Sequence, residues 1–265
     1  MYTVVGGKGK SLNVIKAPLR GPDGGIVGIC GIARDMTERR KVEKALREAN
    51  ASLDILNSIT RHDVLNQLMV VRGYSDLVRS SLKDPKELEH MDKIEKATRT
   101  IRSQILFTKD FQKLGQVEPK WQSVEELFDS AFSTQEVGPV EIGVDVSGLE
   151  VYADPMLEKV FYNLIDNSLR HGEKVTRISV TCRKERDGLD LVYEDDGVGI
   201  RPEDKTRIFD RAFGKNTGLG LFLTKAILGV TQIEIEETGE PGKGARFEMH
   251  VPDGSFRFQE YGRAP

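Results

Sequence analysis

The sequence predicts an α+β protein in which a helical hairpin precedes an α/β sandwich. Between Thr37 and Leu82 the chain has no proline and its composition favours a helix, and a second helical stretch follows Asp84-Pro85. After Pro119 short strand-like segments alternate with short helices, which is the pattern of a layered domain. The 265 residues suffice for roughly two domains.

Composition excludes several function classes. The formal net charge is -3 and basic residues alternate with acidic ones, so we expect no nucleic-acid partner, which would need a clustered basic surface. No apolar run is long enough to span a bilayer, so we expect no membrane contact. The two cysteines, Cys30 and Cys182, indicate a reducing, cytoplasmic compartment, although a longer parent protein could be membrane-anchored.

The N-terminal segment reads as a hairpin. Residues 11–18 and 26–33 have strand patterns on either side of a turn at residues 22–25, and Asp35 or Thr37 is placed to cap the helix that follows. The text GIARDMTERRKVEKAL at its end resembles the C-terminal end of a PAS domain running into its output helix. The resemblance implies that residues 1–36 are the remnant of a PAS-like sensor domain.

The helical region carries apolar stripes. In the first helix the residues Val42, Leu46, Ala49, Leu53 and Leu56 follow the 4-3-4-3 spacing of a coiled-coil seam. The second helix has one apolar face, formed by Leu88, Met91, Ile94, Thr98, Ile101 and Ile105. Because such a hairpin completes its core by dimerising, we expect a homodimeric four-helix bundle.

The second domain is expected to contain three helices and six strands. The helices are predicted at about 124–134, from Asp154-Pro155 to about Arg170, and at 219–229. The strands are predicted near 140–146, 150–153, 176–185, 189–195, 232–238 and 244–251. Residues 254–265 are expected to form a flexible tail.

Two polar motifs in this domain point to a nucleotide. Asn163 and Asn167 are four residues apart and project from one helix face, and amide oxygens suit Mg²⁺. Asp195 follows an apolar strand, where its carboxylate can accept the exocyclic amine of adenine, and Gly197 and Gly199 let the backbone approach a ligand closely. Taken singly, the asparagines are better explained as capping or hydrogen-bonding surface groups, and the aspartate motif is equally well explained as an acidic turn.

Two further motifs follow along the chain. Phe209 and Phe213, in RIFDRAF, are expected to pack in the core beside a mobile segment. Gly218 and Gly220 open a helix, whose free N–H groups and dipole favour phosphate.

The four motifs together resemble the GHKL (Bergerat-type) ATPases, and specifically the catalytic domain of histidine kinases. The matching text is NLIDNSLRHG, DDGVGI, RIFDRAF, TGLGLFLTKAI and GKGARFEMHVP, over about residues 121–252. The resemblance implies a catalytic ATP-binding domain at residues 119–253, with ATP and Mg²⁺ as cofactors. It implies that Asn167 binds the metal and Asp195 binds adenine.

The resemblance assigns the remaining contacts to the nucleotide. They are Asn163, Arg170, His171, Gly197, Gly199, Lys215, Thr217, Gly218, Leu219 and Gly220. The segment 214–217 before Gly218 is shorter than the ATP lid that is usual in the family.

His62 is the candidate phosphoryl acceptor among four histidines. His90 and His250 are interpreted as surface residues, and His171 belongs to the nucleotide motif. Asp63 follows His62 directly and can hold the imidazole proton, and Asn66 lies one helical turn further on the same face.

This triplet resembles the dimerisation and histidine-phosphotransfer domain, so residues 37–118 are expected to hold a signalling helix and that domain. The resemblance implies a sensor histidine kinase that phosphorylates His62 from ATP and passes the phosphoryl group to an aspartate in the receiver domain of a response regulator. The Asp63-x-x-Asn66 pattern implies phosphatase activity toward the regulator as well. Gln67 stands where many relatives have proline.

Two alternatives stay open at this point. A different GHKL ATPase would use a catalytic carboxylate in the asparagine-bearing helix, where Glu158 is available. A non-enzymatic dimeric scaffold would have a degenerate nucleotide site, against which the intact Asn167, Asp195 and paired glycines argue.

Overall fold

The computed structural model describes residues 2–5, 8–135, 138–211, 213 and 218–259. The chain divides into two compact units, Met1–Val71 and Arg72–Pro265. Across the described ranges, no helix combines the length and the apolar character that a membrane span needs.

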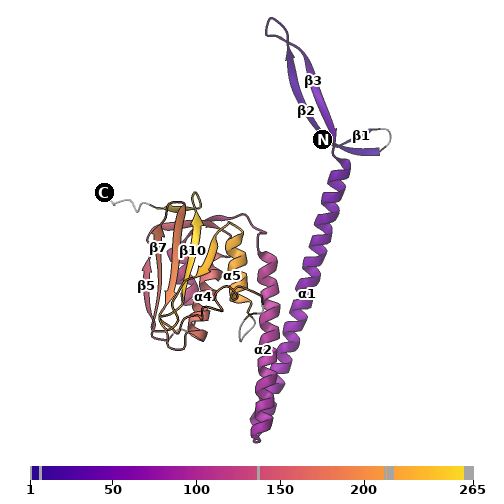
Figure 1. Cartoon of the computed structure of the whole chain (residues 1–265). Helices are drawn as coiled ribbons and strands as arrows, with labels where there is room; N and C mark the ends of the chain where they lie inside the picture. Colours follow the sequence, from indigo (N-terminus) through magenta and orange to yellow (C-terminus); the bar gives the residue numbers. More distant parts are fainter. Residues whose placement is uncertain (1, 6–7, 136–137, 212, 214–217, 260–265) are drawn as a thin grey trace, which may run out of the picture. The chain divides into compact units, whose positions relative to one another are not determined.

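The first unit contains a three-stranded antiparallel sheet and most of a long helix (Figure 1). Its elements are β1 (Tyr2–Val5), β2 (Lys8–Arg20), β3 (Ile26–Asp35) and the start of α1 (Thr37–Ser81). The predicted hairpin is confirmed: β2 and β3 pair along their length, and the Gly21 amide donates to the Gly25 carbonyl at 2.8 Å across the turn. The strand β1 was not predicted.

The hairpin exposes apolar side chains. Each of these residues is more than half exposed: Ile15, Leu19, Ile26, Val27, Ile29 and Ile32. Cross-strand partners share a face, so Ile15 with Ile32 and Pro18 with Ile29 lie on opposite faces of the ribbon. A sheet that is apolar on both faces is typical of a larger domain, and the PAS-like origin of residues 1–36 stays a prediction.

Helix α1 begins at a capped turn. The Asp35 carboxylate accepts hydrogen bonds from the Thr37 amide at 3.0 Å and the Thr37 hydroxyl at 2.6 Å, so Asp35 is the cap. The hydroxyl bond is the main cause that holds the pKa of Asp35 well below its ordinary value. The amide of Ser11 donates to the Thr37 hydroxyl at 2.9 Å, which ties β2 to the start of the helix.

The predicted coiled-coil seam lies on the surface of α1. Val42, Leu46, Leu53 and Leu56 are 57–66% exposed. Such a row of exposed apolar residues favours association with a partner helix. Dimerisation through the bundle stays a prediction.

The second unit opens with the last turns of α1 and with α2 (Pro85–Lys113). Asp84 caps α2 by accepting from the Lys86 amide at 2.9 Å, and Pro85 occupies the first turn, where it needs no hydrogen bond. The Arg79 guanidinium pairs with Asp92 at 2.5 Å and so joins the two helices beside the turn.

Further along, α2 packs against α5 (Gly220–Gly229) through three aromatic rings. The Phe222 centroid lies 6.0 Å from that of Phe107 and 6.1 Å from that of Phe111, while the two α2 rings are 5.6 Å apart. This aromatic cluster and the Lys159–Asp110 ion pair at 3.9 Å connect α2 to the α/β sandwich.

The sandwich has a main sheet of five strands in the order β5-β7-β8-β10-β9. They are β5 (Glu141–Asp145), β7 (Arg177–Lys184), β8 (Gly188–Asp195), β10 (Arg246–Pro252) and β9 (Glu234–Glu237). β5 and β7 are parallel, and the other pairs are antiparallel. A small antiparallel sheet has the order β11 (Phe256–Phe258), β6 (Leu149–Ala153) and β4 (Lys120–Ser123).

Three helices complete the sandwich. They are α3 (Val124–Ser133), α4 (Leu157–His171) and α5, with α4 in contact with both of the others (Figure 1). The core joins helix and sheet side chains that are almost fully buried, among them Phe128, Phe161, Leu164, Ile178, Tyr193 and Phe247. Because strand side chains alternate, Leu191, Tyr193 and Asp195 point from β8 to the same face.

The structure corrects three predictions. α4 begins at Leu157, three residues after Asp154, whose carboxylate accepts from the Met156 amide at 2.8 Å and from the Gly115 amide at 3.0 Å. β4 was missed. The flexible-tail prediction for 254–265 is wrong at β11, which pairs with β6, while residues 260–265 lie outside the described part.

Candidate functional site

The two asparagines of α4 have different surroundings. Asn163 is 8% exposed, and its Nδ2 donates to the Gly220 carbonyl at 3.0 Å and to the Thr224 hydroxyl at 3.2 Å. A Cβ on Gly220 would lie 3.7 Å from the Asn163 amide carbon, so the helix start packs closely on this side chain. Asn163 therefore ties α4 to the beginning of α5.

Asn167 lies one turn further along the same helix. Its Nδ2 is buried and makes no hydrogen bond to any residue that the structure describes. Because the two ends of an amide are assigned from their surroundings, the oxygen fits the same position. An amide with unused hydrogen-bonding capacity and an oxygen donor is a ligand that suits Mg²⁺, so this residue fits the metal that the sequence predicts.

Arg170 and His171 lie at the exposed C-terminal end of α4. Arg170 Nε pairs with Asp166 Oδ1, one turn earlier, at 2.6 Å. Its side chain is 63% exposed, so the ion pair leaves most of the guanidinium facing solvent.

Asp195 ends β8 with its carboxylate turned inward and only 9% of the residue exposed. Oδ1 accepts from the amides of Gly197 at 2.9 Å and Ala245 at 3.1 Å, and Oδ2 accepts from the Ser168 hydroxyl at 2.5 Å. A buried carboxylate needs such partners. These bonds fix the orientation of the group that the sequence assigns to adenine.

The neighbouring Asp196 has a structural role. Its carboxylate accepts from the amides of Thr176 at 2.8 Å and Arg177 at 3.0 Å, where β7 begins. Desolvation opposes ionisation, but the bonds from Thr176 and Arg177 outweigh it and hold the pKa of Asp196 below its ordinary value. Only the first aspartate of the pair thus faces the interior.

The predicted glycines allow three backbone segments to meet at Asp195. A Cβ on Gly197 would lie 2.7 Å from the Gly172 Cα, at the end of α4. Gly199 has φ +71°, and its Cβ would lie 2.8 Å from the Gly244 carbonyl. Gly244 has φ +118° and touches the Asp195 backbone. Glycine is required at such positions. The loop between β9 and β10 thus lies beside Asp195, where it lines a cavity of about 250 Å³.

The glycine motif at the start of α5 is partly described. Gly218 has φ +61°, Leu219 is buried, and Gly220 is the first helical residue. The N-cap residue Leu219 makes no side-chain hydrogen bond to the first turn, and the free amides of a helix start favour an anion. The predicted contacts Lys215 and Thr217 lie outside the described residues.

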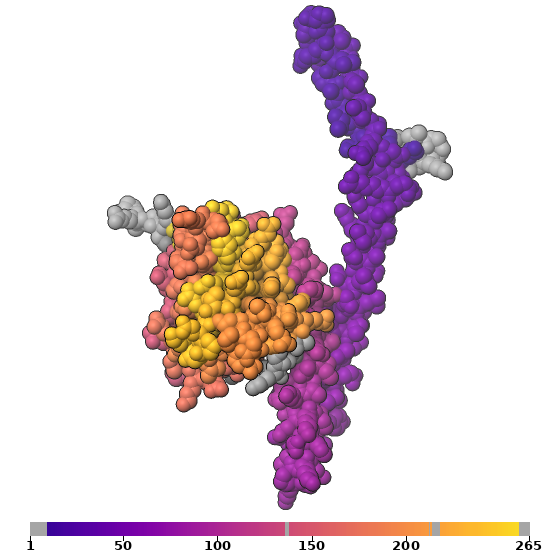
Figure 2. Space-filling model, viewed as in Figure 1, coloured from indigo at the N-terminus to yellow at the C-terminus, as the bar shows by residue number. Residues whose placement is uncertain are grey.

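Residues 201–211, which follow the Asp195 motif, are joined to the β9–β10 loop by Lys205. Figure 2 shows the two surfaces side by side, in orange and yellow. Lys205 Nζ lies 2.9 Å from Glu237 Oε2 and also donates to the Gly239 carbonyl, while the Glu237 side chain is fully buried. Phe209 is in the core against Phe247, as predicted, whereas Phe213 is half-buried under the Arg207 guanidinium at 4.8 Å.

His62 lies exposed on α1 in the first unit, with 73% of its side chain accessible. Asp63 Oδ1 is 3.4 Å from His62 Nδ1, and Asn66 Nδ2 is 3.2 Å from the same nitrogen. The structure thus brings the three predicted residues together. With hydrogen on Nδ1 directed to Asp63, Nε2 carries the electron pair for attack, and Asn66 Nδ2 lies 3.4 Å from this second nitrogen.

Other candidate residues have different partners. His250 Nδ1 pairs with Asp190 at 2.9 Å, and this bond raises the pKa of His250. Glu158, which an alternative ATPase mechanism would need, accepts from the Ser130 hydroxyl of α3 at 2.7 Å. Its carboxylate is thus directed to α3, away from the contacts of Asn163.

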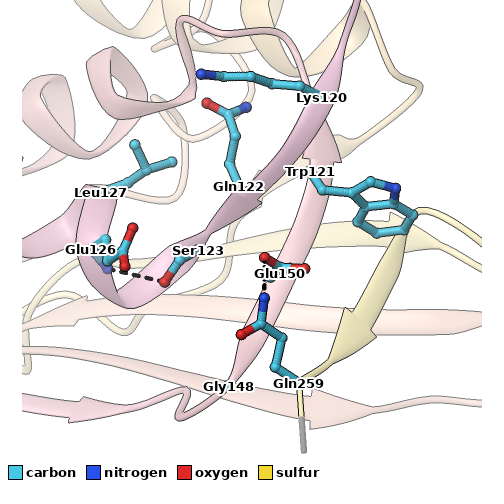
Figure 3. Close-up of a pocket in the computed structure, with 9 residues that line it drawn as sticks. All are labelled: Lys120, Trp121, Gln122, Ser123, Glu126, Leu127, Gly148, Glu150 and Gln259. Carbon is cyan, nitrogen blue, oxygen red and sulfur yellow. Dashed lines mark hydrogen bonds between the residues drawn. The ribbon is translucent and has the colours of Figure 1, made fainter.

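A second pocket, of about 250 Å³, lies at the small sheet (Figure 3). It contains no predicted site residue. Its Glu150 carboxylate accepts from Gln259 Nε2 at 2.6 Å, as drawn, and also pairs with Arg257 at 2.5 Å. The Glu150 carboxylate therefore already has two partners within this pocket region, and the other charged residues that line the pocket are Lys120 and Glu126.

Sequence reasoning missed four residues that shape the site: Ser168, Tyr193, Gly244 and Ala245. Ser168 carries a signal, since it is a polar residue among the buried positions of α4. Tyr193 carries none, because an aromatic residue in an apolar strand is interpreted as core.

Comparison with known proteins agrees with this geometry. The family described as "Histidine kinase-, DNA gyrase B-, and HSP90-like ATPase" matches residues 153–255. The signal transduction histidine-protein kinase AtoS of Escherichia coli is 26% identical over 91% of this chain and 42% of its own length. The alginate biosynthesis sensor protein KinB of Pseudomonas aeruginosa is 27% identical over 94% of this chain and 44% of its own.

Solved structures share the fold. Full-length ShkA in complex with AMPPNP superposes with a TM-score of 0.56 at 19% identity, over 77% of this chain and 46% of that one. Histidine kinase ThkA in complex with response regulator protein TrrA gives 0.51 at 19% identity, over 96% and 78%. The predicted α+β class with a GHKL-type sandwich is confirmed, and the chain spans less than half the length of AtoS and KinB.

Proposed function

We propose that this chain, which belongs to the sensor histidine kinases, transfers the γ-phosphoryl group of ATP to His62. One observation carries the assignment of the acceptor. The imidazole of His62 is exposed on a helix and is contacted by both Asp63 and Asn66, in a chain whose residues 153–255 match an ATPase family. None of the other described histidines combines exposure with this pair of neighbours.

The nucleotide is assigned to the surface between α4, the end of β8 and the start of α5. Asp195 would accept the amine of adenine, and Asn167 would hold the Mg²⁺, which neutralises charge on the phosphates when bound. Gly218, Leu219 and Gly220 would receive phosphate oxygens at the start of α5. The family resemblance adds further contacts at Arg170, His171, Lys215 and Thr217.

The transfer itself requires little more than positioning. His62 Nε2 attacks the γ-phosphorus in line, so an N–P bond forms as the bond to the β–γ bridging oxygen breaks and ADP leaves. The ring becomes cationic, and its Nδ1 proton passes to Asp63, which leaves neutral phosphohistidine. Asn66 lies one helical turn away, with its Nδ2 3.2 Å from Nδ1 and 3.4 Å from Nε2, so it limits the positions that the ring can take.

A second transfer would pass the group to an aspartate of a receiver domain, in the cytoplasm. The N–P bond breaks, an acyl phosphate forms, and His62 regains its proton from Asp63. Asn66 would position the water that hydrolyses the acyl phosphate in the phosphatase direction. The exposed seam of α1 supports a homodimer, and the hairpin at 1–36 supports a sensory input.

The acceptor is tested by incubating the protein with γ-labelled ATP and Mg²⁺. Wild type should gain acid-labile, base-stable label, and His62→Gln should lose it. His90→Gln is the matched control, since it removes an exposed helical histidine from α2. Equal labelling of the His62 variant, or loss of label in the control alone, would show that the acceptor is misassigned.

The metal ligand is tested by titrating ATP with and without Mg²⁺. Asn167→Ala should remove most of the gain in ATP affinity that Mg²⁺ gives to wild type, and should leave binding without the ion almost unchanged. Asn50→Ala, on the exposed surface of α1, is the control. An unchanged response to Mg²⁺ in Asn167→Ala would exclude this residue as a ligand.

A further inference from the structure

Three side chains form a buried row of hydrogen bonds behind the adenine-binding carboxylate. The Tyr193 hydroxyl lies 2.9 Å from the Ser168 hydroxyl, which lies 2.5 Å from Asp195 Oδ2. Tyr193 is fully buried and Ser168 is 3% exposed. Nothing in the proposed transfer chemistry uses either hydroxyl.

The direction of these bonds follows from the chemistry of the groups. A carboxylate only accepts, so the single hydrogen of Ser168 points to Asp195. Ser168 must then accept from Tyr193, which has one hydrogen to give. Burial, opposed by the Ser168 bond, raises the pKa of Tyr193 far above its ordinary value, so the phenol keeps this hydrogen.

The row leaves one acceptor position open on Asp195. Oδ1 already accepts two amide hydrogens, from Gly197 and Ala245, while Oδ2 accepts one, from Ser168. A carboxylate oxygen has two acceptor sites. Oδ2 can therefore accept one more hydrogen, which the amine of a 6-aminopurine supplies. A 6-oxopurine presents an oxygen instead, and two acceptors would face each other.

We propose that Ser168 and Tyr193 are positioning residues that hold Asp195 as an acceptor for a 6-aminopurine and so set the preference for ATP over 6-oxopurine nucleotides. This inference rests on the ATP site proposed above. Tyr193 fixes the Ser168 hydroxyl, and Ser168 stabilises the carboxylate and fixes its rotamer. Without them Asp195 can turn away from the position in which Oδ2 faces the amine.

The experiment measures the dissociation constants of ATP and inosine triphosphate (ITP) by calorimetry. Ser168→Ala should weaken ATP binding about tenfold, as expected for a lost hydrogen bond to a charged group, with ITP binding changed less than about twofold. Tyr193→Phe should weaken ATP binding by about threefold, with the same pattern. Tyr152→Phe, in β6 of the small sheet, and Ser133→Ala, at the end of α3, are the controls.

A double variant separates positioning from stability. Ser168→Ala alone leaves the Tyr193 hydroxyl buried without a partner, which lowers the melting temperature. Ser168→Ala with Tyr193→Phe removes both groups, so the melting temperature should recover while the selectivity for ATP stays low. If Ser168→Ala fails to fold, Tyr193→Phe and the double variant still decide the question.

The outcomes distinguish this inference from the proposed function. If wild type binds neither ATP nor ITP, the proposed ATP site is wrong. Two results would show that Ser168 and Tyr193 have no part in base selection when wild type prefers ATP. In the first, every variant retains the same preference for ATP; in the second, every variant loses affinity for ATP and ITP in parallel. A loss confined to ATP in the single and double variants, with unchanged controls, supports the proposal.

Discussion

Replacing Lys205 with methionine should destabilise the second unit far more than a typical surface substitution. Lys205 Nζ lies 2.9 Å from Oε2 of Glu237, whose side chain is fully buried, while 22% of the lysine side chain is exposed. Methionine keeps the apolar stem and removes the charge. The variant leaves a buried carboxylate without its cation.

The expected magnitude comes from the contacts that remain. Removing one partner of a buried ion pair costs about 3–5 kcal/mol. Glu237 Oε1 still accepts from the amides of Gly239 at 3.1 Å and Arg246 at 3.2 Å, which compensate part of the charge. We therefore expect the free energy of unfolding to fall by about 3 kcal/mol, the lower end of that range.

The assay is urea unfolding followed by the fluorescence of Trp121, the only tryptophan, which lies in the second unit. The matched control is Lys243→Met. Lys243 pairs with Glu240 at 2.5 Å in the same loop, but both side chains are at least 70% exposed, so the control should have a much smaller effect than Lys205→Met. Equal, small losses in the two variants would refute the reasoning from burial.

Three further outcomes are expected. Asp63→Asn should slow labelling of His62 by about 10²-fold or more, the contribution of a proton acceptor, with ATP affinity unchanged in calorimetry. Gly197→Ala should cost about 1–3 kcal/mol in urea unfolding, because its Cβ would meet Gly172 at 2.7 Å; a neutral effect would mean that the loop adjusts freely. The hydrogen bond to Asp190 raises the pKa of His250 in the folded state. The His250–Asp190 pair therefore stabilises the fold fully below the unfolded pKa of histidine, near 6.5, and this stabilisation is lost as the pH rises through the folded-state pKa. The stability advantage of wild type over His250→Asn should thus be larger at pH 5.5 than at pH 8.5, by less than about 1 kcal/mol, since the imidazole is partly exposed.

The helices and most strands could be predicted because their signals are local. The long helices show apolar residues at helical spacing, and Asp84-Pro85 marks the turn between them. β4 and β11 have four and three residues, too few for an alternating pattern to be visible. Asp154 resembles a helix cap in sequence, yet its carboxylate also binds the distant Gly115 amide, which no local pattern reveals.

The candidate site was predictable where its residues are contiguous. Asp195, Gly197 and Gly199 form one motif, and the geometry around them is set by their own turn. The contacts of Ser168 and Gly244 join segments 25 or more residues apart, so no local pattern indicates them. The different roles of Asp195 and Asp196 also depend on strand alternation, which turns neighbouring side chains to opposite faces.

The aromatic cluster of Phe107, Phe111 and Phe222 has a thermodynamic consequence. Phe222 lies two residues after Gly220, where the structure offers amides to an anion, so one helix contacts both α2 and the proposed phosphate site. If a nucleotide binds more tightly when Phe222 is separated from α2, linkage requires that the bound nucleotide weaken the packing of Phe222 on α2 by the same free energy. Each aromatic pair contributes about 0.5–1.5 kcal/mol beyond the burial of its area. The two ring pairs of Phe222 can therefore contribute at most about 3 kcal/mol to the coupling between nucleotide binding and the packing on α2.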